Sequence, residues 1–425
     1  MTHTASDPHS TGSPERLRIT TRPIADPEHL LDRLPLHDPV AWVRNGEGLV
    51  GWGVAARLEV RGPERFSRTQ RWWSNLCTSF DVDDTVSAPG TGPVAFGSFS
   101  FDDETSTSIV ILPRVIVGRR SGQAWITTVG DDPSALRALP PASVPESPDG
   151  VEWVVGSRSA EDWAATVAEA VSRISAGELD KVVLARDIVG EVEGVLDPRH
   201  LLIRLAEDYP TTWTFCVDNL IGATPELLVR RTGDLVTSRV LAGTVRRRSG
   251  HDDEGLAQAL LSSDKDTMEH EYAVHSVAKA LAAHCTDLDV PERPRVLPLA
   301  NVKHLATDVT GRLADSSTVL ALAASLHPTA AVCGTPTERA FSLIRDLEGM
   351  DRGRYAGPVG WFDRHGDGEF GIALRCAEID AEEGRIRAFA GCGIVAGSDP
   401  EDELAESRAK FQPIRSSLDS PVSPA

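Results

Sequence analysis

The chain has 425 residues, 41% of them hydrophobic and 25% charged, which is ordinary for a globular protein with one large domain or two smaller ones. Its formal net charge of -20 argues against binding to nucleic acid or to an anionic membrane surface, because both require a basic face. Six cysteines without a CxxC pair indicate neither a zinc ribbon nor a disulfide framework, and favour a reducing, cytoplasmic setting. No apolar stretch approaches the roughly 20 residues of a membrane span, so we expect no membrane association.

The composition divides the chain into segments. Residues 1–15 read as a disordered leader and residues 417–425 as a disordered tail. Residues 16–150 alternate short apolar runs with Gly/Pro turns, most clearly in the predicted hairpin "TSIVILPRVIVGRRSGQAWITTVG". A connector rich in Pro, Ser and Glu, "LPPASVPESPDG", leads into residues 151–416. We expect the first half to belong to the same domain as this second, chemically richer region.

The second region opens with a predicted helix. Ser159 is a suitable N-cap, Asp162 stands at the capping-box position, and Gly177 follows the last turn. The next run, "KVVLARDIVGEV", predicts a strand in which Lys181 faces the same side as Val183.

Further elements follow in chain order. "ELLVRRTGDLVTSRVLAG" predicts a hairpin, and residues 262–285 predict a helix capped by Ser263. "FGIALRCAEID" and "RIRAFAGCGIVAGS" predict two paired strands around an "AEEG" turn. A last helix begins with Asp399 as cap and Pro400 in the favoured first position. Helices mixed with many hairpins predict an α+β fold with a largely antiparallel sheet.

The stretch "SSDKDTMEHEYAVHSVAKAL" combines acids and histidines on one predicted helix. A zinc peptidase places two histidines four residues apart, so that both face the metal. His270 and His275 are five apart, which rotates the second ring by roughly 140° at about 100° per residue and excludes that site. Asp266 and Glu269, three apart, do share a face, and they have no obvious cation nearby in the sequence.

The same acidic spacing recurs in "SDPEDELAESRAKFQ". Glu403, Glu406 and Lys410 lie on one face of the last predicted helix. If the two acidic helices face each other, their carboxylates suit Mg²⁺, which prefers oxygen ligands and keeps positions open for water and substrate. The alternative is that both pairs are solvated helix faces, and spacing alone does not decide.

Several other residues carry potential chemistry. Lys181, in an apolar strand, would have a lowered pKa if buried, as a general base requires, or would instead reach solvent or pair with a neighbouring acid. Glu226 in "IGATPELLV" is either a proton donor or a surface carboxylate. Arg375 in "IALRCAEI" predicts a buried anionic partner, and Gly391 in "AGCGIV" allows a backbone amide to approach an anion or simply forms a turn. We expect His304 to be structural.

These motifs also occur in a recognisable order. "KVVLAR", "GATPELLV", "LAGTVRR", "SSDKDTMEHE", "VKHLATDVTG", "LHPTAAVCGTP", "GRYAGPVGW", "ALRCAEI" and "AGCGIVAGSDPEDELAESRAK" follow one another over some three fifths of the chain. This order closely resembles the chorismate-utilising enzymes, and among them the isochorismate synthases. The resemblance implies two large, mostly antiparallel sheets with helices on the outside and the site between them.

The resemblance implies a role for each matching residue. Lys181 stands where the family's general base activates water to attack C2 of chorismate, and Glu226 stands where the general acid protonates the departing C4 hydroxyl. The remaining matches are Tyr355, Arg375, Gly391 and Lys410 for the substrate's carboxylates, Glu269 and Glu406 as Mg²⁺ ligands, and Asp266 and Glu403 as supporting acids.

Two positions distinguish the subfamilies. Anthranilate and aminodeoxychorismate synthases resemble this chain but lack a lysine at position 181 and carry a hydroxyl residue where this chain has Ala331. Salicylate synthases keep the lysine, eliminate pyruvate and tend to have threonine at the alanine position. The combination of Lys181 and Ala331 therefore favours isochorismate as the product, which would serve the synthesis of menaquinone or of a catecholate siderophore. We expect a monomer without a glutaminase subunit. "GCG" replaces the commoner "GAG" and is compatible in size.

Overall fold

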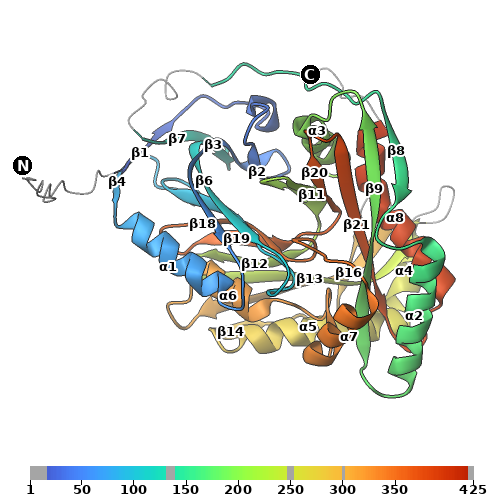
Figure 1. Ribbon diagram of the computed structural model, residues 1–425. Helices are drawn as coiled ribbons and strands as arrows, with labels where there is room; N and C mark the ends of the chain where they lie inside the picture. The colour runs from blue at the N-terminus through green and yellow to red at the C-terminus, as the bar shows by residue number, and fades with distance from the viewer. Residues whose placement is uncertain (1–16, 131–138, 247–252, 299–301, 420–425) are drawn as a thin grey trace, which may run out of the picture.

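The computed structural model describes four stretches of the chain, which are residues 17–130, 139–246, 253–298 and 302–419 (Figure 1). The expected leader, residues 1–15, lies outside them. The strands, in chain order, are β1 (Leu17–Pro23), β2 (Val40–Arg44), β3 (Glu47–Val60), β4 (Phe80–Asp84), β5 (Val94–Ser98), β6 (Ser108–Arg120), β7 (Gln123–Val129), β8 (Gly150–Val155), β9 (Lys181–Glu193), β10 (Trp213–Val217), β11 (Leu220–Thr224), β12 (Leu227–Thr232), β13 (Leu235–Arg246), β14 (Cys285–Asp289), β15 (Arg295–Pro298), β16 (Val302–Leu313), β17 (Gly334–Thr335), β18 (Pro358–Asp363), β19 (Gly368–Ile372), β20 (Cys376–Asp380) and β21 (Arg385–Ile394).

The strands form one hydrogen-bonded network that divides into two branches at β6. One edge of β6 pairs with β3, and this branch continues through β2, β10, β11, β20, β21 and β9 to β8. The other edge pairs with β5, and that branch continues through β18, β19, β12 and β13 to β16. Among the described strands, β1 and β4 are the one parallel pair. The prediction of an α+β fold built on two mostly antiparallel sheets is confirmed, with β6 joining them.

Helices cover the outer faces of both branches. They are η1 (Leu31–Arg33), α1 (Arg65–Cys77), α2 (Ala160–Ser175), α3 (Pro198–Asp208), α4 (Asp253–Leu261), α5 (Asp264–Leu281), α6 (Val319–Leu326), α7 (Thr337–Leu347) and α8 (Pro400–Asp419). Helices α5 and α6 lie beneath the β12–β13–β16 branch, whereas α2 and α8 run along the outer side of β9 and β21 (Figure 1). No helix in the described stretches is both long and apolar enough to cross a membrane.

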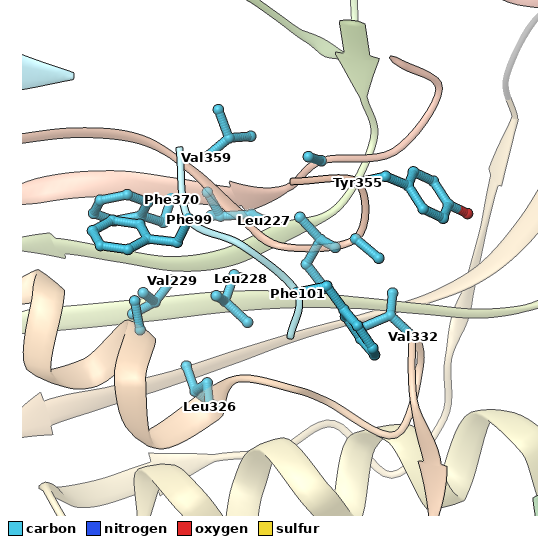
Figure 2. Packing of buried hydrophobic residues seen from close by; sticks show 14 of the residues in the cluster. Phe99, Phe101, Leu227, Leu228, Val229, Leu326, Val332, Tyr355, Val359 and Phe370 are labelled. Atoms are coloured by element: carbon cyan, nitrogen blue, oxygen red, sulfur yellow. The ribbon is translucent and has the colours of Figure 1, made fainter. Parts of the chain in front are cut away.

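The buried core joins both halves of the sequence. Its larger cluster contains Phe66 and Phe99 from before the connector, and Trp163 and Phe370 from after it. Figure 2 shows part of this cluster, in which Phe99 and Phe370 lie together and the Tyr355 side chain points away from them. The hydroxyl of Tyr355 thereby leaves the apolar core, which places a polar group at its boundary.

Most of the predicted elements occur as expected, with one instructive difference. The run "FGIALRCAEID", predicted as a single strand, is divided between β19 and β20. The division falls at Arg375, whose φ of 49° lies in the left-handed region and cannot continue a strand. At the C-terminus, α8 extends to Asp419, three residues into the segment that we expected to be a disordered tail.

Helix α2 begins at the predicted cap. The Ser159 side chain accepts a hydrogen bond from the Asp162 backbone amide. We therefore expect Ser159→Ala to lower the free energy of unfolding by about 1 kcal/mol, because one helical N–H group loses its partner. Denaturant-induced unfolding measures this, and Ser159→Asp should keep most of the stability. Equal stability of wild type and Ser159→Ala would contradict the assigned cap.

Candidate active site

A cavity lies where β9 and β21 of one branch approach β13 and β16 of the other. Seven of the ten predicted site residues line it, namely Glu226, Glu269, Tyr355, Arg375, Gly391, Glu406 and Lys410. They come from the β11–β12 junction, from α5 and α8, from β21 and from the two loops that flank β18 and β19. Ala331, the position that distinguishes the subfamilies, lines the same cavity.

Lys181 is connected to this cavity through Glu269, which lines it. It is the first residue of β9, is completely buried, and its Nζ donates a 2.9 Å hydrogen bond to Glu269 Oε1. Gly393 of the paired strand β21 makes room for this contact. A Cβ atom there would lie 2.6 Å from Glu269 Oε1 and 3.0 Å from Lys181 Cε, so a larger residue would force the ion pair apart.

A second lysine–glutamate pair stands on α8. Lys410 Nζ lies 2.5 Å from Glu406 Oε1 and donates to the Gly391 carbonyl at 2.8 Å. Burial opposes the charge on Lys410, but the Glu406 carboxylate outweighs it and raises the pKa of Lys410 above its ordinary value. The sequence showed no obvious cation close to the acids of the predicted helix 262–285. The structure corrects this, because Glu269 and Glu406 each have a lysine partner.

The four acids are buried or partly buried rather than spread over solvated helix faces. Asp266 accepts hydrogen bonds from the Thr244 amide at 3.1 Å and from the Ser263 hydroxyl at 2.5 Å. Glu403, only 4% exposed, accepts one from Ser398 Oγ at 2.8 Å. Both therefore stabilise the helix turns that present Glu269 and Glu406, which fits the supporting position expected for them.

The donor atoms suit a hard divalent cation. Two carboxylates, Glu269 and Glu406, face the cavity, and oxygen ligands of this kind are those that Mg²⁺ prefers. The donor atoms of Cys392, Glu403 and Glu406 also lie within 4.8 Å of one another. The Cys392 thiol, however, donates to the Glu403 backbone carbonyl, and a soft sulfur is a poor Mg²⁺ ligand. The fit therefore rests on the carboxylates.

Glu226 is a buried acid in its neutral form near pH 7. It is 4% exposed and lies at the start of β12, on the cavity wall. Burial raises the pKa of Glu226 from its ordinary 4.5 to about 8, although a hydrogen bond from the Leu241 amide and three nearby cations act in the opposite direction. A carboxyl group protonated at neutral pH can donate a proton, so Glu226 meets the requirement for a general acid.

Arg375 is oriented by a histidine. Its Nη2 lies 3.4 Å from His304 Nε2, and His304 Nδ1 lies 3.0 Å from Thr244 Oγ1. Because a guanidinium can only donate, Nε2 accepts and the ring proton is assigned to Nδ1. Burial, together with the neighbouring cations, lowers the pKa of His304 well below its ordinary value, so the ring is neutral. Tyr355 completes this wall, and its hydroxyl oxygen lies 2.9 Å from where a Cβ at position 391 would be.

The sequence reasoning missed some of this arrangement. His304 was expected to be purely structural, yet it lines the cavity beside Arg375. Arg352 was not considered, and it also lines the cavity from within a buried ion pair. By contrast, His270 has a structural role, since its buried ring bonds to the Ala242 carbonyl and to Thr307 Oγ1, while His275 is exposed.

Comparison with known proteins identifies the family. The chorismate binding enzyme family matches residues 24–131 and 137–419, which is nearly the whole described chain. The chain belongs to this family. Isochorismate synthase MenF of Bacillus subtilis is 30% identical over 402 residues, covering 87% of this chain and 85% of that protein. The salicylate biosynthesis isochorismate synthase of Pseudomonas aeruginosa is 34% identical over 408 residues, covering 89% and 84%.

A solved structure of the same family has the same architecture. MenF, the menaquinone-specific isochorismate synthase of Escherichia coli, superimposes with a TM-score of 0.77 at 25% sequence identity. The match covers 95% of this chain and 94% of that one. The resemblance seen in the motifs therefore extends through the less distinctive N-terminal half of this chorismate-binding enzyme.

The protonation of Glu226 can be tested without any assay of activity. Below pH 4.5 both the folded and the unfolded chain bind this proton, but between pH 4.5 and about 8 only the folded chain keeps it. As the pH rises through this window, the unfolding free energy of the wild type, relative to that of Glu226→Gln, should thus fall by ~1 kcal/mol per pH unit. Denaturant titrations at several pH values measure it, and parallel profiles would refute the raised pKa.

Proposed function

We propose that this chorismate-binding enzyme is a Mg²⁺-dependent isochorismate synthase. The observation that carries the proposal is the pairing of a proton acceptor with a proton donor at one cavity: Lys181 at its Glu269 side, and the buried Glu226, with a pKa of about 8, on its wall. The relatives described above carry the name isochorismate synthase, and they match this chain over most of its length.

The proposed reaction needs both groups. For this step Lys181 must first be in its unprotonated form. It then accepts a proton from water as the water oxygen bonds to C2 of chorismate, both ring double bonds shift, and the C4–oxygen bond breaks. Glu226 gives its proton to the departing oxygen, which leaves as water. One water enters and one leaves, so the product is an isomer of the substrate. An allylic hydroxyl leaves poorly unless it is protonated, hence the requirement for a neutral acid.

Charge explains the remaining residues. Chorismate is a dianion, and the protein carries a formal charge of -20, so the cavity must supply local positive charge. We assign Arg375, Lys410 and Tyr355 to the substrate's carboxylates, with the Gly391 backbone beside them. Glu269 and Glu406 would hold Mg²⁺, which when bound adds positive charge opposite a substrate carboxylate.

The same residues bear on the alternative reactions. Ala331 on the cavity wall offers no hydroxyl group, which favours water addition over the ammonia-dependent and pyruvate-eliminating reactions. A water nucleophile requires no glutaminase subunit. We also infer that residues 16–150 and 151–416 form one domain, since the buried core mixes residues from both. That the protein acts as a monomer is proposed from the resemblance of its motifs to the family.

Removing the proposed base tests the assignment. Lys181→Ala should lower kcat by ~10²–10⁴-fold, since the proposed proton acceptor is then missing. Chromatography of chorismate reactions with Mg²⁺ measures isochorismate and any salicylate together. Lys279→Ala, an exposed position on α5, serves as the control. Near-normal isochorismate from Lys181→Ala would remove it as the base, and salicylate as the main wild-type product would instead establish the pyruvate-eliminating reaction.

Removing a proposed metal ligand should change the metal requirement. Glu406→Gln should raise the Mg²⁺ concentration for half-maximal activity at least tenfold, because a neutral amide is a weaker ligand than a carboxylate. Glu401→Gln, an exposed acid in the first turn of the same helix, should leave the titration unchanged. If the two variants titrate alike, Glu406 does not belong to the metal site.

A further inference from the structure

A buried ion pair at the edge of the cavity, which Arg352 helps to line, has no part in the proposed chemistry. Glu348 caps the C-terminus of α7, and Arg352 follows it four residues later. Their side chains are 1% and 3% exposed, and Arg352 Nε donates to Glu348 Oε2 at 2.8 Å. Burying two charges carries a large desolvation cost, so further hydrogen bonds must offset it.

Those contacts complete one edge of β9. Along one edge β9 pairs with β21, and on the other edge the partner strand β17 ends opposite Val182. The Val183 amide still bonds to the Cys333 carbonyl at 2.7 Å, and β8 pairs with β9 from Ile188 onward. Between these points side chains satisfy the backbone groups of this edge. Arg352 Nη2 donates to the Val183 carbonyl at 2.8 Å, and the Ala185 amide donates to Glu348 Oε1 at 2.8 Å. Trp163 Nε1 donates to the Ala185 carbonyl at 3.0 Å.

The same guanidinium also holds the segment next to β9 that carries Ala331. Arg352 Nη1 donates to the Val332 carbonyl at 2.9 Å, adjacent to Ala331 in the cavity lining. The Arg352 guanidinium lies 4.1 Å from the centre of the Phe101 ring, and Figure 2 shows Phe101 and Val332 in this part of the core. The Tyr355 amide donates to the Arg352 carbonyl at 3.0 Å. One residue thus ties together the strand of Lys181, the loop of Ala331 and the segment leading to Tyr355.

Geometry links this clamp to the base. Side chains two residues apart on a strand point to the same face, so Lys181, Val183 and Ala185 share one face of β9. Fixing the backbone at Val183 and Ala185 therefore fixes the direction in which Lys181 leaves the strand. The planar fork of arginine can serve two carbonyls and a carboxylate at once, which an ammonium group cannot do in the same geometry.

We propose that Glu348 and Arg352 form a positioning pair that extends the backbone pairing of β17 with β9 and so fixes the Lys181 strand against the Ala331 loop. The proposal rests on the proposed function, because it assigns the pair to the step in which Lys181 receives a proton. The pair touches neither the reacting atoms nor the carboxylate-binding residues through its side chains, so its loss should affect kcat rather than KM.

Arg352→Lys is the decisive variant, because it keeps the charge that neutralises Glu348 and removes the fork. We expect it to fold, with kcat lowered about 10- to 100-fold and KM for chorismate within threefold of wild type. The matched control is Arg199→Lys. Arg199 is 14% exposed and forms a fork with Asp197 at the start of α3, remote from the cavity, so its kcat should not change.

A second variant gives a readout independent of turnover. Glu348→Gln keeps an oxygen acceptor for the Ala185 amide but weakens it, so hydrogen exchange at this amide should accelerate at least tenfold, together with a fall in kcat. Should Arg352→Lys fail to fold, Glu348→Gln alone decides.

Three outcomes would overturn the positioning role: a folded Arg352→Lys with kcat within twofold of wild type, a rise in KM at unchanged kcat, or unchanged kcat in Glu348→Gln. Wild-type protein that makes no isochorismate in the same assay would refute the function itself, which keeps the two failures distinct.

Discussion

Lys181 donates a hydrogen bond of 2.9 Å to Glu269, and this contact joins the first residue of β9 to a helix 88 positions away in the sequence. Charged side chains that are shielded from water need a partner of opposite charge, and this need explains much of the arrangement of side chains around the cavity. Lys410 balances Glu406 in the same way, and Glu226, which has no such partner, is neutral instead. The three glutamates on the wall are therefore either paired with a lysine or protonated, as a low-dielectric site requires.

The two-branched sheet makes this arrangement possible. Because β6 joins both branches, β9 and β21 on one side and β13 and β16 on the other converge on a single cavity, and α5 and α8 each direct a glutamate into it from outside. The acids Asp266 and Glu403 hold the turns from which those glutamates project. A helix whose acidic face would look solvated in isolation is thus a buried component of the site.

The sequence predicts the elements well because their signals are local. Ser159 and Ser263 mark helix starts through their capping side chains, and alternating apolar runs mark the hairpins. Contacts between residues that are far apart in the sequence leave no such local pattern. Neither the pairing of Lys181 with Glu269 nor the His304–Arg375 contact has a local signature, and the break at Arg375 reflects a backbone conformation imposed by tertiary structure. The order of the motifs supplied the roles that spacing left open.

The cavity wall is tightly packed around the glycines of β21. The Tyr355 hydroxyl and the Glu269 carboxylate occupy the space that Cβ atoms at positions 391 and 393 would need. Between these two positions, Cys392 points to the opposite face, where its thiol contacts the Glu403 carbonyl of α8. Glycine at 391 and 393 therefore leaves room for these two groups, whereas position 392 can carry a side chain. A cysteine fits at 392 because its thiol faces α8, while one added methyl group at 393 would push against the Lys181–Glu269 ion pair.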